Sequence, residues 1–200
     1  MNTSDIIAHY DLLIDENNDP ACDPEPLRRY MDKWDGQPFI DKMHLDNTKS
    51  VLEIGVGTGR LALRTAPLCR SFTGIDLSPK TIKRAPKNLS YLQNVTLINA
   101  DFSTYDFPSK FDVIYSSLTF MHIQNKQSAI AKISTLLNTN GIFLLSIDKN
   151  RSDFINTGTS KLIIHPDTPA EILSCLNSAN LTLTEQYETD FAIIFSAAKE

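Results

Sequence analysis

Short apolar runs alternate with segments of helical spacing along most of the chain. Near-continuous apolar runs indicate strands that are buried on both faces of a sheet, and they lie at 50–54, 71–75, 95–98, 111–115 and 141–147. Helical spacing and start signals predict helices at about 60–66, from Ser78-Pro79 onward, at 126–137 and at 169–179. This alternation is typical of an α/β protein.

Two further strands are predicted near the end of the chain, at 181–185 and 191–195. Their connection is too short for a parallel crossover, so they form an antiparallel pair. The chain is therefore predicted to fold as α/β, doubly wound and Rossmann-like. Its seven-stranded sheet is mostly parallel and its last strand is antiparallel.

The first 48 residues differ from this pattern. They are rich in Asp, Asn, Pro and aromatic residues. Apolar positions from 26 to 43 are loosely helical but are interrupted by Gly36 and Pro38, so we expect a helical cap. We expect a single domain over 1–200, divided into the cap (1–48), the core (49–148) and a closing segment with the hairpin (149–200).

Composition narrows the class of protein. The 200 residues with 42% hydrophobic content suit one globular domain, and the net charge of −5 argues against a broad nucleic-acid surface. No apolar run reaches the roughly 20 residues of a membrane span, and the N-terminus lacks the pattern of a secretory signal. The three dispersed cysteines suit a reducing compartment and show no metal-binding spacing. We expect a cytoplasmic protein without a structural metal.

A glycine-rich loop directly follows the strand at 50–54. Glycines in Gly55-Val56-Gly57-Thr58-Gly59 permit a tight turn and a close approach of the backbone to a ligand. This spacing differs from the Gly-x-Gly-x-x-Gly of dinucleotide-binding proteins, which argues against a nicotinamide oxidoreductase. Glu53 precedes the loop, where its charge repels a pyrophosphate but attracts an ammonium group.

An acid also closes the second strand. Asp76 lies about 20 residues beyond the first glycine, where a carboxylate can accept hydrogen bonds from ribose hydroxyls. Together with Glu53, it indicates a nucleoside ligand that carries a cationic amine and no phosphates.

These motifs resemble the class I S-adenosylmethionine-dependent methyltransferase domain over about residues 50–148. Glu53 to Gly59 resembles its first motif, in which Gly55 and Gly57 approach the methyl donor. The resemblance makes Asp76 the ribose-binding acid and Leu77 the apolar residue beside the adenine. S-adenosylmethionine is then the expected cofactor and S-adenosylhomocysteine its product.

Three other segments extend the resemblance. Asn99-Ala100-Asp101-Phe102 is similar to the third-strand motif, which implies that Asp101 addresses the adenine amino group and Phe102 lies beside the ring. The fourth strand resembles the motif whose end lies near the methionine part of the donor, which implicates Tyr115. Tyr10-Asp11 resembles an N-terminal aromatic–acid pair whose aromatic residue helps to close over the donor.

The resemblance implies transfer of a methyl group by in-line displacement. Such a reaction depends mainly on positioning, so no universal catalytic residue is expected. His122, just after the fourth strand, and His165, in the segment after the fifth, are candidate bases. Each also fits a structural role, His122 at a helix start or in the core and His165 in a loop.

The acceptor is expected to be a small molecule that offers an O, N or S atom. The fourth strand lacks the Asn/Asp-Pro-Pro-aromatic pattern of enzymes that methylate nucleic-acid amino groups. The cap and the segment 149–168 would form the acceptor pocket, in a monomer or homodimer without membrane or nucleic-acid partners. The alternatives are a non-catalytic S-adenosylmethionine-binding module and a methyltransferase that acts on RNA or protein.

Overall fold

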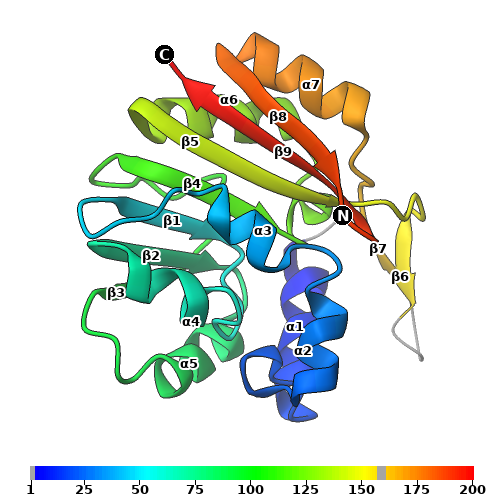
Figure 1. Cartoon of the computed structure of the whole chain (residues 1–200). Coiled ribbons are helices and arrows are strands. Elements are labelled where there is room, and N and C mark those ends of the chain that lie inside the picture. Colours follow the sequence, from blue (N-terminus) through cyan, green and yellow to red (C-terminus); the bar gives the residue numbers. More distant parts are fainter. Residues whose placement is uncertain (1–2, 157–160) are drawn as a thin grey trace.

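A seven-stranded sheet forms the centre of the structure, a computed structural model that describes residues 3–156 and 161–200 (Figure 1). The order across the sheet is β3-β2-β1-β4-β5-β9-β8. All neighbouring pairs from β3 to β5 are parallel, whereas β9 is antiparallel to both β5 and β8. The strands are β1 Ser50–Ile54, β2 Ser71–Asp76, β3 Val95–Asn99, β4 Phe111–Ser117, β5 Leu137–Asp148, β8 Leu181–Glu188 and β9 Ala192–Lys199.

Helices cover both faces of this sheet, and a small hairpin of β6 (Phe154–Asn156) and β7 (Lys161–Ile163) stands beside it. The α-helices are α1 Thr3–Asp15, α2 Glu25–Met31, α3 Gly36–Asp41, α4 Ala62–Thr65, α5 Pro79–Asn88, α6 Lys126–Leu136 and α7 Pro169–Ser178. Single 3₁₀ turns lie at η1 Pro20–Cys22, η2 Ala66–Leu68 and η3 Phe120–His122. Among the described residues, no helix has the length and apolarity to cross a bilayer.

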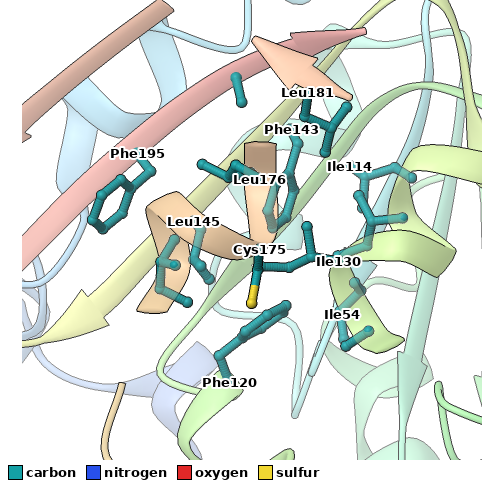
Figure 2. Close-up of a cluster of buried hydrophobic side chains, with 14 of the residues drawn as sticks. Ile54, Ile114, Phe120, Ile130, Phe143, Leu145, Cys175, Leu176, Leu181 and Phe195 are labelled. Atoms are coloured by element: carbon teal, nitrogen blue, oxygen red, sulfur yellow. The ribbon is translucent and has the colours of Figure 1, made fainter. Parts of the chain in front are cut away.

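The alternation of side chains along the strands divides the core between the two faces. Leu52 and Ile54 of β1 face the α6–α7 side, where Figure 2 shows Ile54 beside Ile130 and Phe120. Val51 faces the other side, against α3, α4 and α5. Each large apolar side chain buried in this way contributes roughly 1.5–3 kcal/mol. The strands therefore have apolar residues on both faces, as their near-continuous apolar sequences predicted.

The predicted architecture is confirmed, including the antiparallel closing strand. Ser78 caps α5 as expected, because its hydroxyl oxygen accepts a hydrogen bond from the Thr81 N–H at 3.1 Å. Several boundaries differ. β5 already begins at Leu137, and the closing strands β8 and β9 extend to Glu188 and Lys199. The helix expected at about 60–66 is the short α4 followed by η2, which contains Pro67.

The N-terminal region is more deeply built into the fold than a cap. α3 packs on the sheet, with Phe39 fully buried and Ile40 nearly so. α1 was not among the predicted helices, although Ile6, Tyr10 and Ile14 recur at intervals of four residues along one helix face. α1 packs against α5 and β7, and this places its side chains near the carboxyl ends of the parallel strands.

Candidate functional site

A cavity of about 560 Å³ opens at the carboxyl ends of β1, β2 and β4. β1 lies between β2 and β4, where the direction of strand addition reverses, and such switch points are where open α/β sheets bind ligands. One side of the cavity is formed by the glycine loop and the ends of β2 and β3. The opposite side is formed by α1, η3 and the segment that follows β7. Ten of the predicted residues line the cavity: Tyr10, Glu53, Gly55, Gly57, Asp76, Leu77, Asp101, Phe102, His122 and His165.

The glycine loop follows β1 and depends on two different properties of glycine. Gly55 has a φ of +81°, and a Cβ built on it would lie 1.9 Å from Thr119 Oγ1. Gly57 also has a positive φ, +55°, but a Cβ there would meet nothing within 4 Å. Gly55 is therefore required by packing, while Gly57 leaves open space beside the cavity for a ligand to approach the backbone.

Asp76 lies at the end of β2 and holds the glycine loop in place. Its carboxylate accepts hydrogen bonds from the backbone N–H groups of Gly57 and Ser78, both at 2.9 Å. Burial raises the pKa of Asp76, while these N–H donors act in the opposite direction because they favour the charged form. An acid is thus presented at the cavity wall next to the loop.

Glu53 is buried at the end of β1. Tyr115 Oη donates a hydrogen bond to Glu53 Oε2 at 2.9 Å and lies 2.8 Å from Thr65 Oγ1. Burial raises the pKa of Glu53 to about 8, although the hydrogen bond from Tyr115 and the nearby charge of Arg60 both favour ionisation. A cation placed beside this carboxyl group would favour its ionised form.

Tyr115 itself is not brought to the cavity. Its side chain is fully buried in the core beside Phe39 and does not appear among the lining residues. The reason is the parallel register, which pairs Tyr115 with Glu53 and turns both side chains to the same face of the sheet. The expected direct contact of Tyr115 with the donor is therefore corrected: it reaches the site only through Glu53.

The third-strand motif forms another part of the wall. The Asp101 carboxylate accepts a hydrogen bond from the Ser103 N–H at 2.7 Å, which shapes the turn after β3. Phe102 packs into the apolar core but still lines the cavity, as does Leu77 after β2. These three residues combine one acceptor with two apolar side chains, a set that suits a flat aromatic ring with an exocyclic amine.

The opposite wall joins residues far apart in sequence. Tyr10 Oη on α1 lies 2.7 Å from His122 Nε2 on η3. The backbone N–H of His165 donates to the Met121 carbonyl at 2.8 Å, which attaches the segment after β7 to η3. Lys126 Nζ reinforces this attachment through the His165 carbonyl, at 2.9 Å, and a buried ion pair with Asp167, at 2.8 Å.

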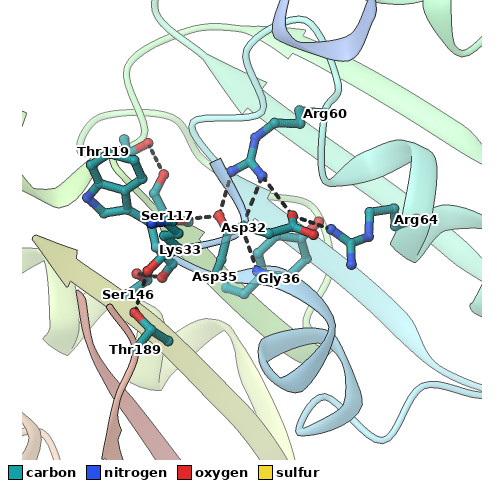
Figure 3. Close-up of polar contacts among 12 residues, drawn as sticks. Asp32, Lys33, Asp35, Gly36, Arg60, Arg64, Ser117, Thr119, Ser146 and Thr189 are labelled. Carbon is teal, nitrogen blue, oxygen red and sulfur yellow. Dashed lines mark hydrogen bonds and ion pairs between the residues drawn. The ribbon is translucent and has the colours of Figure 1, made fainter. Parts of the chain in front are cut away.

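A buried ion pair that was not predicted from the sequence joins the N-terminal region to the glycine loop (Figure 3). Both terminal nitrogens of Arg60 donate to Asp35, at 2.9 and 2.5 Å. Asp35 also accepts from the Gly36 N–H and from the Ser117 hydroxyl at the end of β4. Arg60 directly follows the last glycine, but nothing in the sequence indicates a partner 25 residues earlier.

Comparison with known proteins shows which family this chain resembles. The family described as "Methyltransferase domain" matches residues 51–141. An uncharacterized methyltransferase of Bacillus licheniformis is 26% identical over 183 residues, which cover 83% of this chain and 84% of that protein. The chain is a class I S-adenosylmethionine-dependent methyltransferase. Its predicted family membership is thereby confirmed.

Solved structures agree with this methyltransferase in fold. An S-adenosylmethionine dependent methyltransferase from Mesorhizobium loti has a TM-score of 0.66 at 18% identity, covering 81% of this chain and 96% of that one. Magnesium protoporphyrin IX methyltransferase from Synechocystis, solved with bound S-adenosylhomocysteine, has a TM-score of 0.62 at 17% identity, covering 77% and 75%.

The residues of the methyltransferase fit the donor that its family uses. Gly57 leaves open space beside the backbone, and Asp76 supplies a carboxylate next to it. Glu53 supplies a second acid, which is nearly buried and suits an amine. The cavity volume also falls within the roughly 300–1,000 Å³ of small-ligand sites.

Proposed function

We propose that the chain transfers a methyl group from S-adenosylmethionine to an O, N or S atom of a small molecule by in-line displacement. The observation that carries this proposal is that one cavity combines two walls. The donor motifs form one wall, and α1, η3 and the segment after β7 form the other. Donor and acceptor would therefore lie side by side in the same space.

Positioning is the main contribution of the chain's own residues. When bound, S-adenosylmethionine supplies a methyl group activated by its sulfonium. Asp76 would hold the ribose, Asp101 the adenine amino group and Glu53 the amine. Tyr10 would close the cavity from α1, which helps to exclude water. Well-oriented reactions in one complex reach effective molarities of about 10⁵–10⁸ M, so this holding can supply much of the rate.

Several observations support a small acceptor. The cavity holds about 560 Å³, a size typical of small-molecule sites. The net charge of −5 disfavours a nucleic-acid surface. The chain also shares its fold with the Synechocystis methyltransferase, which is named for a small molecule, magnesium protoporphyrin IX.

Calorimetric titration with S-adenosylmethionine, S-adenosylhomocysteine and NAD tests the donor. We expect the first two to bind with micromolar affinity and NAD not to bind. Asp76→Ala should weaken donor binding by roughly 1.5–3 kcal/mol, because it removes hydrogen bonds to a charged group. Asp106→Ala, at an exposed position away from the cavity, is the matched control. Binding of NAD alone, or unchanged donor affinity in a folded Asp76→Ala protein, would contradict the proposal.

A further inference from the structure

The pair of Tyr10 and His122 is a polar contact in the cavity that the donor motifs do not explain. It joins α1 to η3 on the side opposite the glycine loop, with 2.7 Å between Oη and Nε2. The rings meet edge to face, with centroids 5.4 Å apart. His122 Nδ1 is buried and finds no hydrogen-bond partner among the described residues. A proton that moves between the cavity and this imidazole therefore passes through the Tyr10 hydroxyl.

Both members of the pair are held neutral. Burial raises the pKa of Tyr10, and the nearby Asp76 carboxylate adds to this effect. Burial lowers the pKa of His122 to about 4, and the groups that face it, His9, Lys126 and His165, act in the same direction. A neutral imidazole suits this position, because a second cation would repel the sulfonium of the donor.

The lining residues of α1, η3 and the segment after β7 carry no formal charge either. Ile6 and Ile7 from α1 and Met121 from η3 are apolar, and burial lowers the pKa of His165. Among the described lining residues from α1, η3 and the segment after β7, none is a carboxylate or an amine. The charged lining residues lie on other elements, and among them Arg60 follows the glycine loop, Asp76 ends β2 and Lys132 lies on α6. On α1, η3 and the segment after β7, an anionic or cationic acceptor would find no counter-ion, so this wall suits an uncharged, largely apolar molecule.

We propose that the acceptor is an uncharged, largely apolar molecule with a hydroxyl or thiol group, and that Tyr10 and His122 take its proton. This inference rests on the proposed methyl transfer. The Tyr10 hydroxyl donates to His122 Nε2, which leaves a lone pair on Oη to accept a hydrogen bond from the acceptor's O–H or S–H. Tyr10 is thus the residue that touches the acceptor, and His122 acts through it.

The step is balanced in atoms and charge. The acceptor atom forms a bond to the methyl carbon as the carbon–sulfur bond of the donor breaks, and that electron pair stays on sulfur. The acceptor's proton moves to Tyr10 Oη, and the proton of Tyr10 moves to His122 Nε2. One positive charge is present throughout, first on the sulfonium and then on the imidazolium, which returns its proton to solvent after product release.

The weak basicity of His122 selects the acceptor atom. A hydroxyl or thiol becomes strongly acidic as it is methylated, so even an imidazole with a pKa of about 4 can accept its proton. An alkyl amine resembles lysine, with a pKa of about 10, so it is protonated at neutral pH, and an imidazole this weakly basic would not remove the proton that blocks its lone pair. The pair therefore favours an O or S acceptor over an N acceptor.

A panel of single-ring probes tests the acceptor class. Phenol, thiophenol, benzylamine and benzoate are each incubated with the protein and S-adenosylmethionine labelled in its methyl group. We expect label in phenol or thiophenol and none in benzylamine or benzoate. Label only in the amine or the carboxylate, or in none of the probes, would overturn the proposal. Calorimetric binding of S-adenosylmethionine in the same preparation separates this failure from failure of the donor assignment.

Variants test the proton path. Tyr10→Phe should lower kcat on phenol about 10²-fold, while KM for phenol and the calorimetric affinity for S-adenosylmethionine stay close to native, because the ring remains and only the hydroxyl that relays the proton is lost. His122→Gln should show the same selective loss. Tyr91→Phe, at a position that is 64% exposed, is the control for removing a phenol oxygen. A loss expressed in KM or in donor affinity, with kcat retained, would overturn the proposal, because a purely structural change acts on binding.

Discussion

Replacing Glu53 by glutamine removes a carboxyl group while keeping its size. The glutamine carbonyl can still accept the hydrogen bond that Tyr115 donates, so the variant should fold normally. What changes is the ability to ionise. In the native chain, burial raises the pKa of Glu53 from 4.5 to about 8, and the carboxylates of Asp35 and Asp76 add to the effect.

The shift in the pKa of Glu53 sets the size and sign of its effects on stability and on donor binding. A rise from 4.5 to about 8 corresponds to roughly 5 kcal/mol against the ionised form. Between these values the folded chain binds more protons than the unfolded chain, so the free energy of unfolding falls as pH rises. Glu53→Gln removes this loss. The free energy of unfolding of the variant should equal that of the native chain at about pH 4. By about pH 8 the variant's value should be higher by up to roughly 5 kcal/mol.

Donor binding should show the complementary effect. If the donor's ammonium group lies beside Glu53, binding must first remove the proton from this carboxyl group. The affinity of the native chain for S-adenosylmethionine should then rise about tenfold per pH unit between about pH 6 and pH 8, with release of a proton. In Glu53→Gln this dependence should disappear, because the amide does not titrate.

Two measurements check this reasoning. Urea unfolding at several pH values gives the stability difference, and calorimetry in buffers of different ionisation enthalpy gives the affinity and the protons released. Methylthioadenosine, which lacks the amine, is the control ligand, since its affinity should not depend on Glu53 ionisation. An affinity for S-adenosylmethionine that stays flat over this pH range, or the same slope in Glu53→Gln, would refute the assignment of Glu53.

Two other changes separate ligand contact from packing. Gly57→Ala should weaken donor binding in calorimetry with only about 1 kcal/mol of lost stability. Gly55→Ala should lower Tm clearly, because its Cβ would collide with Thr119. A larger loss of stability in Gly57→Ala than in Gly55→Ala would contradict the geometry. Asp35→Asn should destabilise the fold by up to roughly 3–5 kcal/mol in urea unfolding, because it leaves the Arg60 charge with only the more distant Asp32, at 3.9 Å; an unchanged midpoint would show that the pair is dispensable.

The sheet and the donor side of the cavity could be predicted because their signals are local. An apolar run of about five residues indicates a buried strand, and the loop after it is read from three glycines and the acid before them. Asp76 and Asp101 each end a strand, and the carboxyl ends of parallel strands meet at one edge. Their order along the chain is therefore enough to place them in one cavity.

The rest depends on contacts between distant segments, which no local pattern records. Tyr115 faces the core because its register pairs it with Glu53, and that register is set by β1 and β4 together. Arg60 meets Asp35, and Tyr10 meets His122, only after α1 and α3 pack on the finished sheet. The sequence by itself determined the fold class and the donor motifs, because their spacing is short. Only the tertiary structure decided which side chains form the acceptor wall, because burial and long-range packing set their partners and their protonation.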